Sequence, residues 1–179
     1  MYDAVNSQVK ASTTRINSYA QQIAALNEAI DRSMAVTNGA APNDLLDQRD
    51  QLLADLSKEV RVTVVKQNTS YDVYIGNGLS LVVGGRAYEL TNVASPTDPS
   101  RLEVAYKSND VTTILSENVI SGGNLSGLLE FRSQTLDLAS NSLGRIATVL
   151  ASTFNEQHAL GMDLNGAIGG NFFTVASPV

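Results

Sequence analysis

An arginine lies between two aspartates in the segment NDLLDQRDQLLADL, as Asp47, Arg49 and Asp50. On a helix, carboxylates at this spacing lie close enough to share a metal ion or a proton. Arg49 would compete for both carboxylates, however, and the segment contains no histidine. We therefore interpret the three charges as a structural cluster.

Three further features could carry chemistry, and each lacks a necessary part. His158 is the only histidine, so neither a histidine metal pair nor a histidine-based triad with a spare base can be assembled. The segment DLNG, residues 163–166, is similar to part of a calcium loop but lacks a third acid and the glutamate that closes such loops. The segment GGNLSG, residues 122–127, has neither the P-loop lysine nor the glycine spacing of a dinucleotide site. We predict no catalytic residue, no cofactor and no metal, and hence no enzyme.

The composition excludes several classes of partner. The chain has 179 residues, of which 43% are hydrophobic and 6% aromatic, as expected for one or two domains with an aliphatic core. Its net charge is −6 and its 12 lysines and arginines form no basic run, so we predict no nucleic-acid partner. No apolar run reaches the roughly 20 residues that span a bilayer, and no signal-peptide pattern is visible, so we predict no membrane contact. The absence of cysteine excludes disulfides and thiolate sites.

The helical segments follow from the spacing of apolar residues. Along residues 5–34 the spacing alternates between four and three, which predicts a long helix that packs at a shallow angle against others. A second helix is expected to end near Lys58. After residue 124 leucines recur every seven positions and predict a third helix of about 35 residues: Leu129, Leu136, Leu143 and Leu150. Because such a helix needs partners, we predict an elongated three-helix bundle with coiled-coil-like helices.

Between these helices, residues 61–116 are rich in Val, Ile, Tyr and Thr and alternate with a period of two, which predicts antiparallel strands. Two-residue hairpin turns are expected at Asn77-Gly78, Gly84-Gly85 and Asn109-Asp110. The predicted class is α+β. It comprises a helical bundle domain of residues 1–60 and 117–160, an inserted antiparallel β unit of residues 61–116, and a loop of residues 161–179 that leads out of the bundle.

A second arginine on an apolar row gives the acidic cluster a possible partner. Arg132 lies in the third helix among three polar neighbours, Glu130, Gln134 and Asp137. We hypothesise that Arg49 pairs with one of these three, and that Arg132 pairs with an acid of the second helix such as Asp47. Reciprocal pairs of this kind would fix the register of two otherwise uniform aliphatic helix faces.

Several motifs occur in order along almost the whole chain. They are PNDLLDQRDQLLADLSKEV at residues 42–60, GGNLSGLLEFRSQTLD at 122–137, FNEQH at 154–158 and G-x-D-x-x-G at 161–166. Together they resemble the hook-associated protein 1 family of bacterial flagella, FlgK. The polymerising terminal segments of that family are not recognisable, so the chain is expected to be an internal fragment.

The resemblance implies a non-enzymatic structural subunit at the junction between hook and filament, needed for filament assembly and motility. It implies an extracellular location in the flagellum, after export by the flagellar type III apparatus with a chaperone and without a cleaved signal peptide. The implied partners are the hook subunit, the second junction protein and neighbouring copies in the axial assembly. A secreted or surface-exposed adhesin, or a secretion-tip binding module, of similar build is the alternative.

Overall fold

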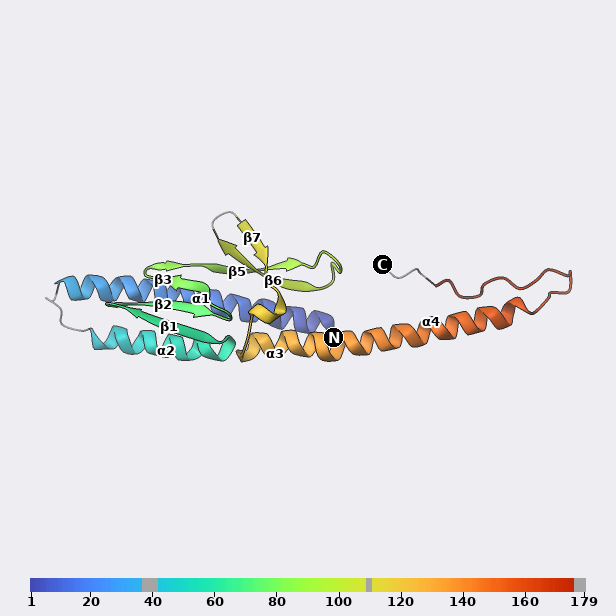
Figure 1. Ribbon diagram of the computed structural model, residues 1–179, viewed down its shortest axis with the longest axis horizontal. Helices are drawn as coiled ribbons and strands as arrows, with labels where there is room; N and C mark the ends of the chain where they lie inside the picture. Colours follow the sequence, from blue (N-terminus) through green and yellow to red (C-terminus); the bar gives the residue numbers. More distant parts are fainter. Residues whose placement is uncertain (37–41, 109–110, 176–179) are drawn as a thin grey trace. The chain divides into compact units, whose positions relative to one another are not determined.

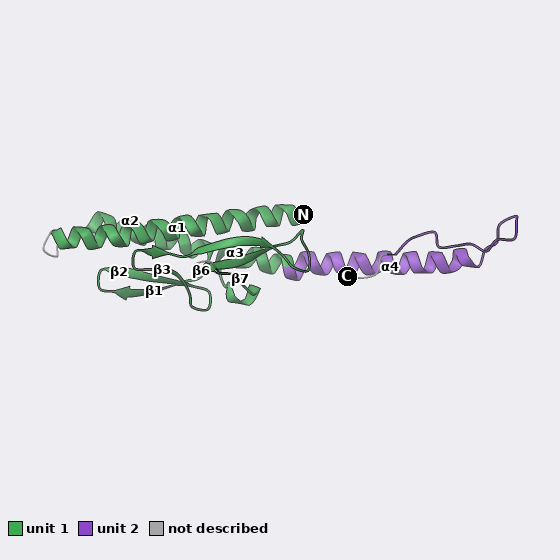
Figure 2. Cartoon of the chain, turned by 90° about the horizontal axis from the view of Figure 1, so that it is seen from above, with its two compact units in different colours: residues 1–132 green, residues 133–179 purple. Residues whose placement is uncertain are grey.

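The computed structural model describes residues 1–36, 42–108 and 111–175. The chain divides into two compact units, Met1–Arg132 and Ser133–Val179, which Figure 2 shows in different colours. The combination of helices with antiparallel sheets confirms the predicted α+β class. Among the described residues, no helix is both long enough and apolar enough to cross a membrane.

The first unit begins with two helices that lie side by side, α1 (Tyr2–Val36) and α2 (Asn43–Glu59) (Figure 1). The strands follow in the order β1 (Val62–Gln67), β2 (Ser70–Ile75), β3 (Leu79–Val83), β4 (Arg86–Ala87), β5 (Glu89–Ala94), β6 (Leu102–Ser108) and β7 (Val111–Ile114). A 3₁₀ turn, η1 (Glu117–Val119), then leads to α3 (Gly123–Phe131). A π-helical turn, η2 (Arg132–Leu136), is followed by α4 (Asp137–Ala159), the main element of the second unit.

The strands form two antiparallel sheets. Sheet A has the order β1-β2-β3-β4 and sheet B the order β5-β6-β7, and strands of both sheets contact α1 (Figure 1). Gly84-Gly85 connects β3 to β4 as a two-residue turn, as predicted. The turn predicted at Asn77-Gly78 has three residues, because Gly76 also leaves β2, with a φ of 55° that few other residues adopt. The turn predicted at Asn109-Asp110 lies outside the described residues.

Helix α1 is buried on two sides. Most of the predicted apolar row is buried, while its members Tyr19 and Leu26 are half-buried. The buried hydrophobic members are Val5, Val9, Ile16, Ile23 and Ile30. A second buried row consists of small and polar residues that the predicted row did not include: Asn6, Thr13, Ala20, Ala24 and Asn27. Small side chains allow the strands to approach this side of the helix closely, and the two asparagines reach strand or loop backbone, as described below.

The predicted three-helix bundle of long helices is not confirmed. Helix α3 has only 9 residues, and α4 belongs to the second unit. The predicted third helix of about 35 residues is interrupted by the π-helical turn at Arg132–Leu136. The periodicity of the sequence did reveal the helices, but it did not show that strands cover one side of α1.

Candidate functional site

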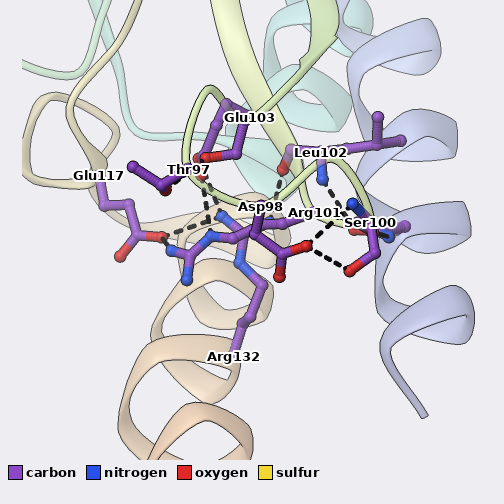
Figure 3. Close-up of polar contacts among 10 residues, drawn as sticks. Thr97, Asp98, Ser100, Arg101, Leu102, Glu103, Glu117 and Arg132 are labelled. Carbon is purple, nitrogen blue, oxygen red and sulfur yellow. Dashed lines mark hydrogen bonds and ion pairs between the residues drawn. The ribbon is translucent and has the colours of Figure 1, made fainter. Parts of the chain in front are cut away.

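Arg132, at the end of α3, has no exposed side-chain surface and is the centre of a charged network (Figure 3). Its Nη1 donates to the carbonyl oxygen of Leu102 at 2.5 Å. Its Nη2 donates to Oε2 of Glu103 at 3.1 Å and to Oε1 of Glu117 at 2.9 Å. One buried guanidinium therefore joins α3 to strand β6 and to η1.

A second arginine completes the network. Arg101 donates from Nε to Oε1 of Glu103 at 2.8 Å and from Nη2 to Oε1 of Glu117 at 2.6 Å. Each of the two carboxylates thus contacts both guanidinium groups, and the four formal charges cancel. Charge cancellation with shared hydrogen bonds offsets the cost of burying the Arg132 guanidinium. We call these four residues, Arg101, Glu103, Glu117 and Arg132, the charge network.

The loop that precedes β6 is fixed next to the charge network. Within the loop, Asp98 accepts hydrogen bonds from Oγ of Ser100 at 2.6 Å and from its backbone N–H at 3.0 Å. These bonds stabilise the ionised carboxylate and lower the pKa of Asp98. From the other side, Asn6 of α1 donates to the Ser100 carbonyl at 2.7 Å and accepts from the Leu102 N–H at 3.2 Å. The loop is therefore held by α1 and by α3.

Arg49 is also buried, with 1% of its surface exposed. Its Nη1 donates to Oδ1 of Asn27 at 3.0 Å and to the carbonyl oxygen of Thr69 at 2.9 Å. Its guanidinium carbon lies 3.5 Å from the centroid of the Tyr71 ring, a cation–π contact. Arg49 therefore joins α2 to α1 and to the hairpin between β1 and β2.

These contacts correct the partners that we predicted for the two arginines. Arg49 was expected to reach Glu130, Gln134 or Asp137, and Arg132 to reach an acid such as Asp47. Instead, both guanidinium groups bind strands, turns and α1, because the sheets cover the side of the helices on which the arginines lie. Of the predicted acids, Asp47 and Asp50 are exposed on α2, Glu130 is exposed on α3, and Asp137 lies in the second unit.

Three asparagines of α1 bind strand or loop backbone in the same way, and the sequence did not single them out. Each side-chain amide both donates to a carbonyl oxygen and accepts from an N–H, as Asn6 does with the loop before β6. Asn17 bonds both backbone groups of Leu90 on β5, at 2.7 and 2.9 Å. Asn27 bonds both backbone groups of Tyr71 on β2, at 2.9 and 3.1 Å.

The spacing of these asparagines was the available signal. Positions 6, 17 and 27 are separated by about three helical turns each, so the side chains lie on one side of α1. Each side-chain amide forms the hydrogen bonds that a neighbouring strand would otherwise form, so the backbone groups that it binds are not buried without a partner. Asn6, Asn17 and Asn27, which we call the asparagine row, thus attach both sheets to one helix.

Glu59 joins the end of α2 to the neighbouring helices. It is 6% exposed and accepts hydrogen bonds from Ser12 at 2.6 Å and from Arg15 at 2.8 and 3.0 Å. Burial by itself would raise the pKa of Glu59, but the bonds from Arg15 and Ser12 outweigh burial, and the pKa is lowered. Gly123 at the start of α3 has a φ of 72°, and a Cβ there would lie 2.5 Å from the Glu59 carbonyl carbon. Close contact between α2 and α3 requires this glycine.

In the second unit, Asn155 repeats the two-sided amide contact. Its Nδ2 donates to the Phe173 carbonyl at 2.8 Å, while its Oδ1 accepts from the N–H groups of Phe172 and Phe173 at 2.8 and 2.9 Å. The Phe154 ring lies 5.2 Å from both of these rings. The chain after α4 therefore turns back and is attached to the helix.

His158 and the segment of residues 163–166 both take part in this reversal. Nδ1 of His158 lies 2.7 Å from the carbonyl oxygen of Gly170. Asp163 accepts from the N–H groups of Ala167 and Asn165, each at 2.8 Å, and these bonds lower its pKa. The carboxylate therefore closes a turn.

Within the described residues, no group of three or more potential metal ligands is found. The buried polar side chains bind one another and the backbone, and among the described residues the Nε atoms of Arg49 and Arg132 are buried without a hydrogen-bond partner. The fold and these contacts define a structural α+β domain in which polar side chains hold two sheets on a helix.

The chain belongs to a known family: the model of the flagellar hook-associated protein FlgK helical domain matches residues 1–173. This confirms the resemblance that the motifs indicated. Flagellar hook-associated protein 1 of Escherichia coli (strain K12) is 46% identical over 176 residues, which cover 97% of this chain and 32% of that protein. The protein of the same name from Salmonella typhimurium is 46% identical over 177 residues, with 98% and 32% covered.

A solved structure, of the flagellar hook junction protein FlgK from Burkholderia pseudomallei, has a similar fold. It has 44% sequence identity and a TM-score of 0.88, and the match covers 99% of this chain and 32% of that one. The chain thus spans about a third of the length of these relatives. The relatives do not support the alternative of an adhesin.

Proposed function

We propose that this chain is a structural segment of a protein at the junction between the flagellar hook and the filament, needed for filament assembly and for motility. The match of residues 1–173 to the FlgK helical domain carries the proposal. The relatives named above as hook-associated or hook junction proteins support it.

The proposed mechanism is mechanical rather than catalytic. The charge network and the asparagine row join helices to sheets through buried polar contacts, so a force on a helix is transmitted to the strands. The proposed partners are the hook subunit, the second junction protein and neighbouring copies. The proposed location is extracellular, in the flagellum, after export through the flagellar type III apparatus with a chaperone and without a cleaved signal peptide.

The proposal includes an organisation of the longer protein. Residues 1–60 and 117–160 would contribute to an elongated helical bundle completed by other parts of that protein, and residues 61–116 would form its β unit. Residues 161–179 would lead toward an outer domain. The apolar residues that α4 exposes support a helical neighbour: Leu138, Leu143, Ile146, Val149 and Leu150 are each at least 60% exposed.

A chimera tests the proposal. Residues 1–173 of this chain would replace the matching segment of flagellar hook-associated protein 1 in Escherichia coli, and swimming in soft agar would be measured. The expected result is that the chimeric strain swims and carries filaments, whereas a strain with the segment deleted does neither. The exposed substitution Arg86→Met in the chimera is the matched control and should leave swimming unchanged. A chimera that is exported at full length but supports no filaments would contradict the proposal.

A further inference from the structure

Strand β1 is an edge strand that no other strand covers in the described part of the chain. Sheet A has the order β1-β2-β3-β4, so β1 pairs with β2 on one side alone. All of its residues except Val62 are exposed, including Val64 at 37% and Val65 at 43%.

The register with β2 shows which backbone groups point away from the sheet. Gln67 pairs with Ser70 across a two-residue turn, and the N–H of Gly76 donates to the Arg61 carbonyl at the other end. In an antiparallel ladder, residues bonded to the partner strand alternate with residues that face away. The residues whose backbone N–H and C=O groups point away from β2 are therefore Val62, Val64 and Lys66. We call these three the outward-facing residues.

Strand β1 has few of the features that usually prevent edge strands from pairing. It contains no proline, and the irregularity of sheet A lies between β2 and β3, at Val73 and Tyr74. Its only charge is Lys66, whose ammonium nitrogen lies 5.1 Å from the Tyr71 ring centroid. The free side of β5, by contrast, is bonded by Asn17 of the asparagine row.

We propose that β1 is a self-association site, at which the β1 strands of two copies pair antiparallel in a register centred on Val64. In this register Val64 lies opposite Val64 of the other copy, Val62 opposite Lys66, and Thr63 opposite Val65. Every outward-facing residue then meets another outward-facing residue, so the backbone groups can exchange hydrogen bonds. No like charges oppose each other, and β-branched residues predominate, which favours a second copy as the occupant.

The contact is weak, because a single strand of six residues buries less than the roughly 1,200 Å² of a stable interface. It concerns two copies of the isolated chain in solution and is independent of the proposed function. It also differs from pairing through the exposed apolar residues of α4, which is the competing route to self-association.

Sedimentation velocity and amide hydrogen exchange of the 179-residue chain, at concentrations from micromolar to millimolar, test the proposal. The expected result is reversible dimerisation, with slower exchange of the Val64 amide as the concentration rises. Val64→Lys would place two cations opposite each other and should weaken association by roughly tenfold or more. Val64→Pro removes an outward-facing N–H without removing a bond to β2, and should do the same.

Ile146→Lys on α4 is the matched control, because Ile146 is 64% exposed and lies in the other unit. It should leave the association unchanged. Association that Ile146→Lys abolishes and the Val64 variants preserve would overturn the proposal in favour of α4. A chain that stays monomeric at the highest concentration, or a Val64 amide whose exchange is independent of concentration, would also overturn it. If Val64→Pro fails to fold, Val64→Lys decides, since an exposed strand position accepts lysine.

Discussion

Replacing Arg132 by methionine tests the charge network most severely. The methionine keeps most of the buried apolar volume but removes the cation and the donor to the Leu102 carbonyl. Glu103 and Glu117 would remain, with 13% and 30% of their side chains exposed, and would retain Arg101 as their partner. The variant therefore leaves one excess negative charge in a largely buried network.

The expected loss of unfolding free energy follows from these contacts. Removal of one member of a buried ion pair costs roughly 3 to 5 kcal/mol. Because Arg101 still neutralises part of the remaining charge, we expect a value near the lower end, about 3 kcal/mol. With a urea dependence of about 1.5 to 2 kcal/mol per molar, the midpoint of unfolding should fall by about 1.5 to 2 M.

Tyrosine fluorescence provides an assay for the first unit alone. The chain has no tryptophan, and all 6 tyrosines lie within Met1–Arg132. Arg86→Met removes an exposed arginine of β4 and is the control, with an expected change within about 0.5 kcal/mol. If Arg132→Met costs no more than Arg86→Met, the charge network does not stabilise the fold and the reasoning is wrong.

Four other substitutions test the remaining contacts. Asn17→Asp places a carboxylate against the Leu90 carbonyl and should cost about 2 kcal/mol in urea unfolding, with faster exchange of the Leu90 amide. Arg49→Met should cost about 2 to 3 kcal/mol, because it removes two hydrogen bonds and the cation–π contact with Tyr71. Because the pKa of Glu59 is lowered, its ionised carboxylate stabilises the folded state fully above the ordinary pKa of glutamate, and this stabilisation is lost as the pH falls through the folded-state pKa. Glu59→Gln should therefore reduce the loss of unfolding free energy that the chain shows below about pH 4.5. Asn155→Ala should speed amide exchange in the segment that returns along α4 and leave the tyrosine-monitored unfolding unchanged.

Each of these substitutions has a control at an exposed position. Ser18→Asp adds a charge at an exposed position beside Asn17, and Glu28→Gln removes an exposed acid of α1. Asn141→Ala removes an exposed asparagine of α4. The Asn17 contact would be refuted if Asn17→Asp and Ser18→Asp had the same unfolding free energy. The Glu59 contact would be refuted if the stability of Glu59→Gln depended on acid pH as that of Glu28→Gln does. The Asn155 contact would be refuted if Asn141→Ala and Asn155→Ala gave the same amide exchange. Arg49→Met is compared with Arg86→Met, and equal stability would mean that Arg49 is not a packing contact.

The sequence predicted the helices and the strand region because apolar spacing is a local property. The row that includes Ile16 and Ile23 repeats along α1 and is buried in the structure. The polar contacts could not be predicted in the same way. Asn17 binds Leu90, which lies 73 residues away, and nothing in the local pattern specifies that partner.

The two arginines illustrate the same difference. Arg49 and Arg132 lie on apolar rows of the sequence, and both are buried in the structure. Their partners were predicted from helix-to-helix pairing, which overlooked backbone carbonyls and the acids of β6 and η1. The π-helical turn at Arg132–Leu136 was also missed, because rows spaced by seven residues continue across it without a change in pattern.

The location of the chimeric protein in assembled flagella tests the proposed function most directly. Antibodies raised against this chain would be applied to flagella isolated from the chimeric Escherichia coli strain, and bound gold particles would be located by electron microscopy. The account predicts labelling confined to the point where hook and filament meet. Labelling along the filament, or its absence from flagella while the protein remains in the cell body, would contradict a role at the junction.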